Sequence, residues 1–317
     1  MTTECFVLTR AVHFGACLLF FGIFAFDRFV AVSIVARGHS EIADYWQAHI
    51  RFFSSVALSI VLLSGIAWFV LVAMTMSGLP LGQTLQPEIL KTVWTQTQFG
   101  TVWKWRLLFW LAAAAVATLF YFRKSKFPSH KNPAWIQLPI GGLLLGSLAW
   151  AGHGQEDSIW HLLADILHLL VAGFWPTGLL PLALLLKRLR QIPEPARWNL
   201  IATLVRRFSA MSLVSVALLA LTGWVNAWFL VGSFSNLLEH TYGRWLLAKI
   251  ILFAFAVIIG AVNLLRLKPR LSIEKSQIQT FEATTVQLQC NVHMELAIGM
   301  GIVVVVAILG ILPPAAH

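Results

Sequence analysis

The sequence has little that could form disulfides, sulfur-based metal clusters or a charged, water-facing surface. Only three cysteines occur in 317 residues and none forms a Cys-x-x-Cys pair, which argues against a zinc ribbon or a dithiol redox site. The six methionines are too few to line a conduit. Charged residues make up 11% of the chain and hydrophobic residues 58%, with a mean hydropathy of +0.78. This balance excludes an ordinary water-soluble domain and indicates an integral membrane protein.

Apolar segments recur along the whole chain, and about 20 apolar residues are needed to cross about 30 Å of hydrocarbon. In lipid such a span must be helical, because unpaired backbone groups find no water to bond. We therefore predict an all-α integral membrane protein with eight transmembrane helices, at residues 8–35, 52–76, 103–122, 135–151, 159–186, 208–232, 245–265 and 294–312. Residues 268–292 are the longest polar stretch between these spans and are expected to be a loop.

The net charge of +10 would suggest a nucleic-acid partner in a soluble protein, but its distribution here indicates membrane topology instead. One set of alternate loops carries 17 of the 23 Lys and Arg residues. Because cytoplasmic loops carry the positive excess, both termini and the loop at residues 153–158 are predicted to lie outside. No Lys or Arg occurs between Lys131 and Lys187, which leaves this outer mouth open to a cation.

Two short patterns point to an internal repeat. The third and seventh spans open on a glycine followed six residues later by a cation; these pairs are Gly100 with Arg106 and Gly243 with Lys249. The first and fifth spans align as well, with Arg10-x-x-His13 matching Asp165-x-x-His168. We predict two parallel four-helix repeats, residues 1–151 and 152–317, related by an axis along the membrane normal. The repeat would place His13 and His168 at equivalent positions facing that axis.

The strongest candidate site is the start of the fifth span, where His161, Asp165 and His168 share one helical face. Ionisable groups are costly inside a bilayer, so such a face predicts a metal, haem or proton site. The two histidines would lie about 10 Å apart along the helix axis, too far to share one ion. The alternative is a packed histidine bonded to a neighbouring helix.

Further candidate ligands lie at the outer ends of spans. His153 precedes the fifth span beside an acidic loop, where a solvated histidine is an equally good interpretation. Met74 and Met76 end the second span, and thioethers suit Cu(I), although ordinary packing is the favoured interpretation for this pair.

The chain resembles the CopD/PcoD family of bacterial inner-membrane copper-resistance proteins, and weaker motifs extend the likeness over most of its length. The likeness rests on residues 207–223, the motif Thr241-Tyr-Gly-Arg-Trp-Leu-Leu-Ala-Lys249, residues 260–263 and the tail at 295–314. Gly152-His153 followed by Asp165-x-x-His168 and Trp175 adds to it, and the family domain covers about 204–265. The chain has Trp175-Pro-Thr-Gly178 where the family pattern has Trp-x-Gly-Gly.

The resemblance implies a copper transporter rather than an enzyme. It would import Cu⁺ or Cu²⁺ from the periplasm through a histidine-lined path, and would receive the ion from a periplasmic CopC-like carrier. A second hypothesis is a membrane redox protein that holds haem b between His13 and His168 as axial ligands. A third is an assembly protein that binds neither copper nor haem.

Overall fold

The computed structural model describes residues 2–35, 40–122, 134–151, 158–193, 196–271 and 278–315, and within these ranges all regular secondary structure is helical. Seven helical segments are long and apolar enough to cross a membrane. Their main helices are α1 (Thr2–Phe26), α3 (Ser40–Ser77), α6 (Gln98–Phe122), α9 (Ile159–Leu189), α10 (Ala196–Val231), α12 (Thr241–Val262) and α14 (Ile278–Leu309). The predicted all-α, multi-pass membrane class is thereby confirmed for the described residues.

The predicted fourth span is shorter than expected. In place of a helix over residues 135–151, the chain forms α7 (Ala134–Gly146), a turn, and the short η2 (Ala149–Ala151). Thirteen residues make a helix of only about 20 Å, whereas a hydrocarbon core is about 30 Å thick. The Arg106 guanidinium donates to the carbonyl of Leu144, at 2.8 Å, and to the hydroxyl of Ser147, at 2.7 Å, which satisfies groups where α7 ends.

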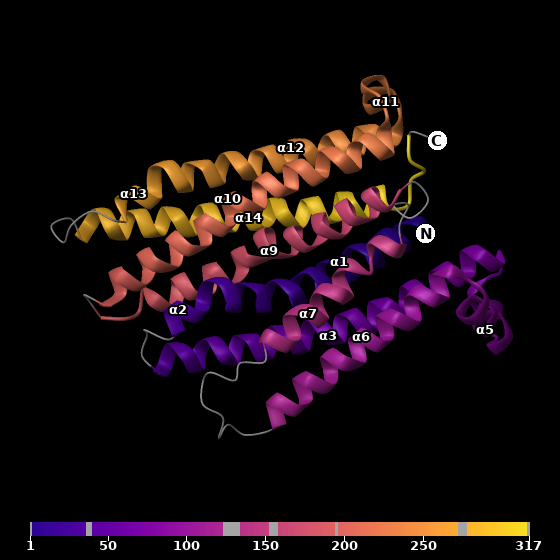
Figure 1. The fold of residues 1–317 in the computed structure, drawn as a ribbon, viewed down its shortest axis with the longest axis horizontal. Helices are drawn as coiled ribbons and strands as arrows, with labels where there is room; N and C mark the ends of the chain where they lie inside the picture. The colour runs from indigo at the N-terminus through magenta and orange to yellow at the C-terminus, as the bar shows by residue number, and fades with distance from the viewer. Residues whose placement is uncertain are drawn as a thin grey trace.

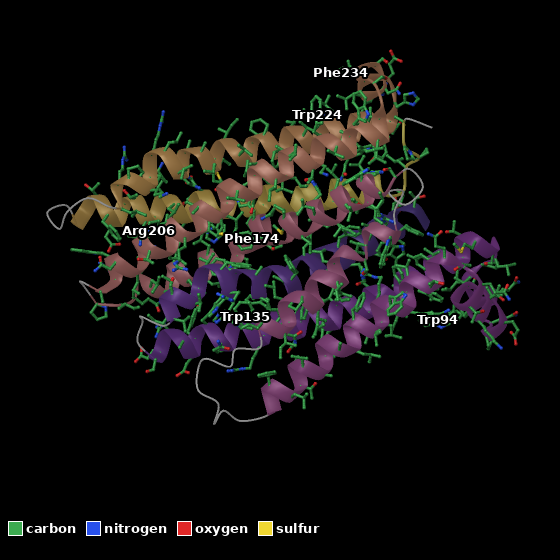
Figure 2. All side chains as sticks on the ribbon, viewed as in Figure 1. Trp94, Trp135, Phe174, Arg206, Trp224 and Phe234 are labelled. Carbon is green, nitrogen blue, oxygen red and sulfur yellow. The ribbon has the colours of Figure 1, made fainter. Side chains whose placement is uncertain are left out.

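The long helices lie side by side in one elongated bundle, and the two termini lie at the same end of it (Figure 1). The short helices α5 (Pro87–Gln96) and α11 (Phe234–Glu239) are also at that end. At the opposite end, α1 continues through η1 (Asp27–Ala31) into α2 (Val32–Val35), and α12 continues through η3 (Asn263–Leu267) into α13 (Lys268–Arg270). Figure 2 shows Arg206 towards this opposite end, whereas Phe234 lies at the end of the termini.

Helices α1 and α9 form the centre of the bundle. α1 packs against α3, α7, α9 and α14, and α9 packs also against α10 and α14. The fully buried side chains between them are large and apolar, including Phe20, Phe24, Leu145 and Leu185. The inward faces of this central pair therefore hold polar residues inside the protein, such as Arg10, His13 and His161, which are buried.

Three helices begin well before the apolar spans from which they were predicted. α3 begins at Ser40, α10 at Ala196 and α14 at Ile278, inside segments expected to be loops. Buried side chains explain the added turns: Trp46 is fully buried and donates to Asp27 at 2.6 Å, and Leu204 of α10 is also fully buried. Most of the predicted loop at 268–292 is thus helical.

Candidate functional site

A cavity of about 320 Å³ lies among α1, α9, α10, α12 and α14, and we call it the His168 cavity. The side chains of His161, Asp165 and His168 all line it, because α9 is continuous from Ile159 and keeps their i, i+4, i+7 spacing on one face. Ser158 caps the start of this helix by accepting from the backbone N–H of Trp160. The predicted grouping of these three residues is therefore present.

The hydrogen bonds of His168 fix its ring as the neutral form with a proton on Nδ1. Thr222 donates its hydroxyl hydrogen to the carbonyl of Leu218, at 2.7 Å, so it accepts from Nδ1 of His168, at 2.9 Å. Nε2 is then the acceptor, and the Nζ atom of Lys249 lies 3.4 Å from it. Gly223 lies beside the ring, and a Cβ there would be in ordinary van der Waals contact with Cε1, at 3.5 Å.

Asp165 provides the negative charge of the cavity. Its Oδ1 accepts from Nδ2 of Asn226 at 3.1 Å, and the carboxylate interacts electrostatically with Lys249 and His161. His161 is 1% exposed and stacks parallel to Phe229, with ring centroids 4.9 Å apart. Within the described part of the chain, Oδ1 of Asn226 is buried and has no hydrogen-bond partner.

The opposite wall of the His168 cavity carries a second cation, Arg10 of α1. Its guanidinium lies 4.7 Å from the ring centre of Trp68, a cation–π contact, and also contacts Gly310. Two cations, one carboxylate and two imidazoles therefore line this one cavity. In the described ranges, no three His, Cys, Asp or Glu side chains converge closely enough to hold a metal ion.

His13 lines a different cavity, of about 190 Å³, which we call the His13 cavity. Ser64 donates to the carbonyl of Ile60 and accepts from Nδ1 of His13 at 2.9 Å, while Nε2 of His13 accepts from Arg106 at 2.5 Å. Both ring nitrogens are thus engaged. These are the contacts expected of a histidine that bonds neighbouring helices.

The same three-residue arrangement occurs in both halves of the chain. His13 bonds Ser64 and Arg106, and His168 bonds Thr222 and faces Lys249. A glycine follows each hydroxyl residue and lies beside the imidazole; these are Gly65 and Gly223. A Cβ added at Gly65 would lie 3.4 Å from Cε1 of His13, and one added at Gly223 would lie 3.5 Å from Cε1 of His168. The two cations, Arg106 and Lys249, are those that follow Gly100 and Gly243 by six residues. The sequence pattern therefore identified both cations but not the histidines beside them.

The remaining candidates are not brought to these cavities. His13 and His168 line separate cavities, each bonded within its own half, which lends no support to one haem held between them. Met74 and Met76 lie at the end of α3, Met76 is 54% exposed, and neither lines the His13 or His168 cavity. His153 lies outside the described residues.

Comparison with known proteins gives consistent matches along the chain. Residues 1–163 match the family model "Copper resistance protein D-like, N-terminal domain", and residues 202–309 match "Copper resistance protein D". Copper resistance protein D of Pseudomonas syringae pv. tomato is 33% identical over 268 residues, which cover 82% of this chain and 83% of that protein.

Two further relatives are more distant or longer. The copper transport protein CutJ of Bacillus subtilis (strain 168) is 30% identical over 73% of this chain but only 40% of its own length. The inner membrane protein YebZ of Escherichia coli (strain K12) is 25% identical over 97% of this chain and 98% of its own. No solved structure matches the chain.

Proposed function

Because the chain belongs to the copper resistance protein D family, we propose that it binds copper in the His168 cavity and carries it across the bacterial inner membrane, from periplasm to cytoplasm. The names of its relatives support copper handling in general and a membrane location. The observation that carries the more specific proposal is a set of acceptor atoms around one cavity, with a lysine ammonium lying among them.

The acceptors suit a copper ion in kind. Nε2 of His168 bears the free lone pair of a neutral imidazole, the carboxylate of Asp165 lies one turn away, and Oδ1 of Asn226 is buried and unpaired. Imidazole nitrogen suits copper in either oxidation state, and carboxylate and amide oxygens suit Cu²⁺ better than Cu⁺. A mixed nitrogen and oxygen shell is therefore the expected environment of the bound ion.

Lys249 is the group that an arriving ion must displace. Its ammonium lies 3.4 Å from Nε2 of His168, in front of the lone pair that copper would use. A copper ion at Nε2 would repel the ammonium, which is carried on a flexible four-carbon stem and can swing aside within the cavity. Lys249 would thus act as a tethered cation that interacts with the acceptor atoms and keeps them ordered until copper replaces it.

The first half of the chain would hold a fixed copy of this arrangement. Arg106 donates to His13, Leu144 and Ser147 at once, so its guanidinium is held in place by several bonds. We infer that residues 1–151 and 152–317 are parallel repeats, with both termini outside. His13 would then have a structural role, and His168 would be the equivalent residue that binds copper.

Access to the His168 cavity would be from the periplasmic end. His161 lies one helical turn before Asp165, nearer the start of α9, and would receive the ion before His168 does. His153, Met74 and Met76 are retained as candidates for first contact at that end, and a periplasmic CopC-like carrier is the proposed donor of copper.

Equilibrium copper binding by the purified full chain tests this proposal. Wild type should bind copper without a Soret band, and His168→Ala should bind much less while accumulating normally. The matched control is His293→Ala, because His293 is exposed and bonds the carbonyl of Gln289 on its own helix. Unchanged binding by His168→Ala would contradict the proposal, and a Soret band in the wild type would favour the haem hypothesis.

A further inference from the structure

A smaller cavity, of about 130 Å³, lies among α9, α10, α14 and the α12–η3 junction, and we call it the Glu295 cavity. The same two helices, α9 and α14, line it and the His168 cavity. Trp175 and Glu295 face the Glu295 cavity, whereas the next residue on each helix, Pro176 or Leu296, faces the His168 cavity. The two cavities therefore follow one another along the same helix pair.

Glu295 is a buried acid in the interior of a membrane-spanning helix. It is 3% exposed, and its Oε1 accepts from Nδ2 of Asn263 at 2.6 Å. The Oδ1 atom of Asn263 accepts in turn from Nδ2 of Asn291, also at 2.6 Å. Both amides therefore donate in the direction of Glu295, an orientation that stabilises a negatively charged carboxylate.

The second carboxylate oxygen remains available. Among the described residues, Oε2 of Glu295 takes part in no hydrogen bond, and a Cβ on Gly260 would lie 3.6 Å from it. Ser212, on α10, lines the same cavity and has a buried hydroxyl without a partner in the described ranges. No Lys, Arg or His lines this cavity to balance the charge.

The other charged groups on the surrounding elements face elsewhere. His293 of α14, Arg206 and Arg207 of α10 and Arg266 of η3 are exposed. On α9 and α12, Asp165, His168 and Lys249 line the His168 cavity instead, and Lys187 of α9 is exposed. Asp27 of η1 is bonded to Trp46. Glu295 is thus the single titratable group among the residues that line its cavity.

A proton fits this cavity better than a metal ion does. A metal ion is usually coordinated by several oxygen atoms, as the six to eight around Ca²⁺ show. Among the described residues, this cavity offers only the unpaired Ser212 hydroxyl and the carboxylate oxygen of Glu295 that Asn263 does not bond. The rest of the lining is mostly apolar, including Trp175, Leu179 and Phe208. An uncompensated carboxylate in such surroundings is costly, and one proton removes its charge.

We propose that Glu295 is a proton-binding site whose loading alternates with copper occupancy of the adjacent His168 cavity. This inference rests on the proposed copper transport for its coupling, but not for the proton site itself. In the step, a proton from water forms an O–H bond at Oε2 and later returns to water, so no other reactant is needed. The shared walls at Trp175–Pro176 and Glu295–Leu296 supply the mechanical link, since a shift of α14 against α9 alters both cavities together.

The proton site is tested first without copper, by infrared difference spectroscopy of the full chain in lipid as the pH is lowered. The wild type should show a carboxylic-acid band that appears on acidification and is lost in Glu295→Gln. Glu282→Gln is the matched control, because Glu282 lies on the same helix, is 36% exposed and pairs with Arg197. If the band persists in folded Glu295→Gln, the proposal is wrong.

Should Glu295→Gln fail to fold, Ser212→Ala keeps the carboxyl group and removes its unpaired neighbour. The acid band should then shift in frequency or in midpoint pH, and an unchanged band would contradict the proposed site.

Coupling is tested by copper uptake into vesicles with an imposed pH difference. Wild-type and Glu282→Gln rates should change several-fold with the direction of the gradient, and Glu295→Gln should still bind copper but lose this dependence. A wild-type uptake rate that is the same for both directions of the pH gradient would contradict the coupling. If the wild type binds no copper, the proposed function fails together with the coupling, while the infrared band still decides whether Glu295 takes up a proton.

Discussion

The ammonium of Lys249 lies 3.4 Å from Nε2 of His168, the ring nitrogen that Thr222 leaves free by accepting from Nδ1. A cation therefore already occupies the position from which the neutral imidazole would bind copper. The arrangement separates two roles: Thr222 fixes the tautomer and orientation of the ring, and Lys249 controls access to its lone pair.

Removing the charge of Lys249 should strengthen copper binding. Two unit charges about 6 Å apart at an effective dielectric constant of about 20 repel by about 3 kcal/mol, part of which the moving side chain avoids. For Lys249→Met we expect a roughly tenfold lower Kd for copper, or about 1.4 kcal/mol. Titration of the purified protein measures this, with Lys91→Met on exposed α5 as the control. Weaker binding by Lys249→Met would indicate that the lysine assists the ion instead.

His13 should matter for stability and not for copper binding. In His13→Ala the buried guanidinium of Arg106 loses one acceptor, and an unpaired buried donor costs about 1–3 kcal/mol or more when charged. We expect a lower Tm and reduced accumulation, with an unchanged copper-to-protein ratio in the folded fraction. A folded His13→Ala protein that has lost its copper would show that His13 is itself a ligand.

The contact between the central helices α1 and α9 depends on Gly22. A Cβ at this position would overlap the carbonyl oxygen of Gly173 and the hydroxyl of Thr177. Gly22→Ala should therefore destabilise the protein by about 1–3 kcal/mol, as overpacking commonly does. Gly15→Ala, on the same helix with nothing within 4 Å of a Cβ, should leave the thermal midpoint unchanged. Equal midpoints for the two variants would contradict this close packing.

Topology can be checked with reporter fusions. The charge distribution predicts that a fusion after residue 130 reports the cytoplasm and a fusion after residue 155 reports the periplasm. Because α7 is short, this pair of fusions also decides whether the segment between them crosses the membrane. Identical locations for the two reporters would show that the predicted fourth span does not cross. The chain would then cross seven times, and every later helix would have the opposite orientation.

The sequence was sufficient for the fold class and for the grouping on α9, but not for the polar partners. Of the eight spans predicted from hydrophobic length, seven are long and apolar enough in the described structure to cross a membrane. Helical spacing identified His161, Asp165 and His168 as one face. The sequence marks Arg106 and Lys249 only as repeated cations near the starts of two spans, and it predicts no partner for either. Only the three-dimensional arrangement shows that each lies beside a histidine of another helix.

The short length of α7 and the position of Glu295 within α14 have a common cause. Hydropathy shows where an apolar segment begins and ends. The ends of a helix depend instead on capping and on packing against other helices. Gly146 and Ser147 end α7 early, whereas packing extends α14 back to Ile278 through a polar segment. Glu295 therefore lies deep within a helix rather than near its end, and the cavity beside it could not be predicted from its neighbours in the sequence.

X-ray absorption at the copper K edge, on the copper-loaded full chain, tests the central claim most directly. The account predicts a first shell of nitrogen and oxygen, with imidazole scattering that is lost in His168→Ala and retained in His13→Ala. A shell made mainly of sulfur, unchanged in His168→Ala, would contradict it. The sulfur ligands would then be sought in Met74, Met76 and Cys17, the last of which is buried in α1.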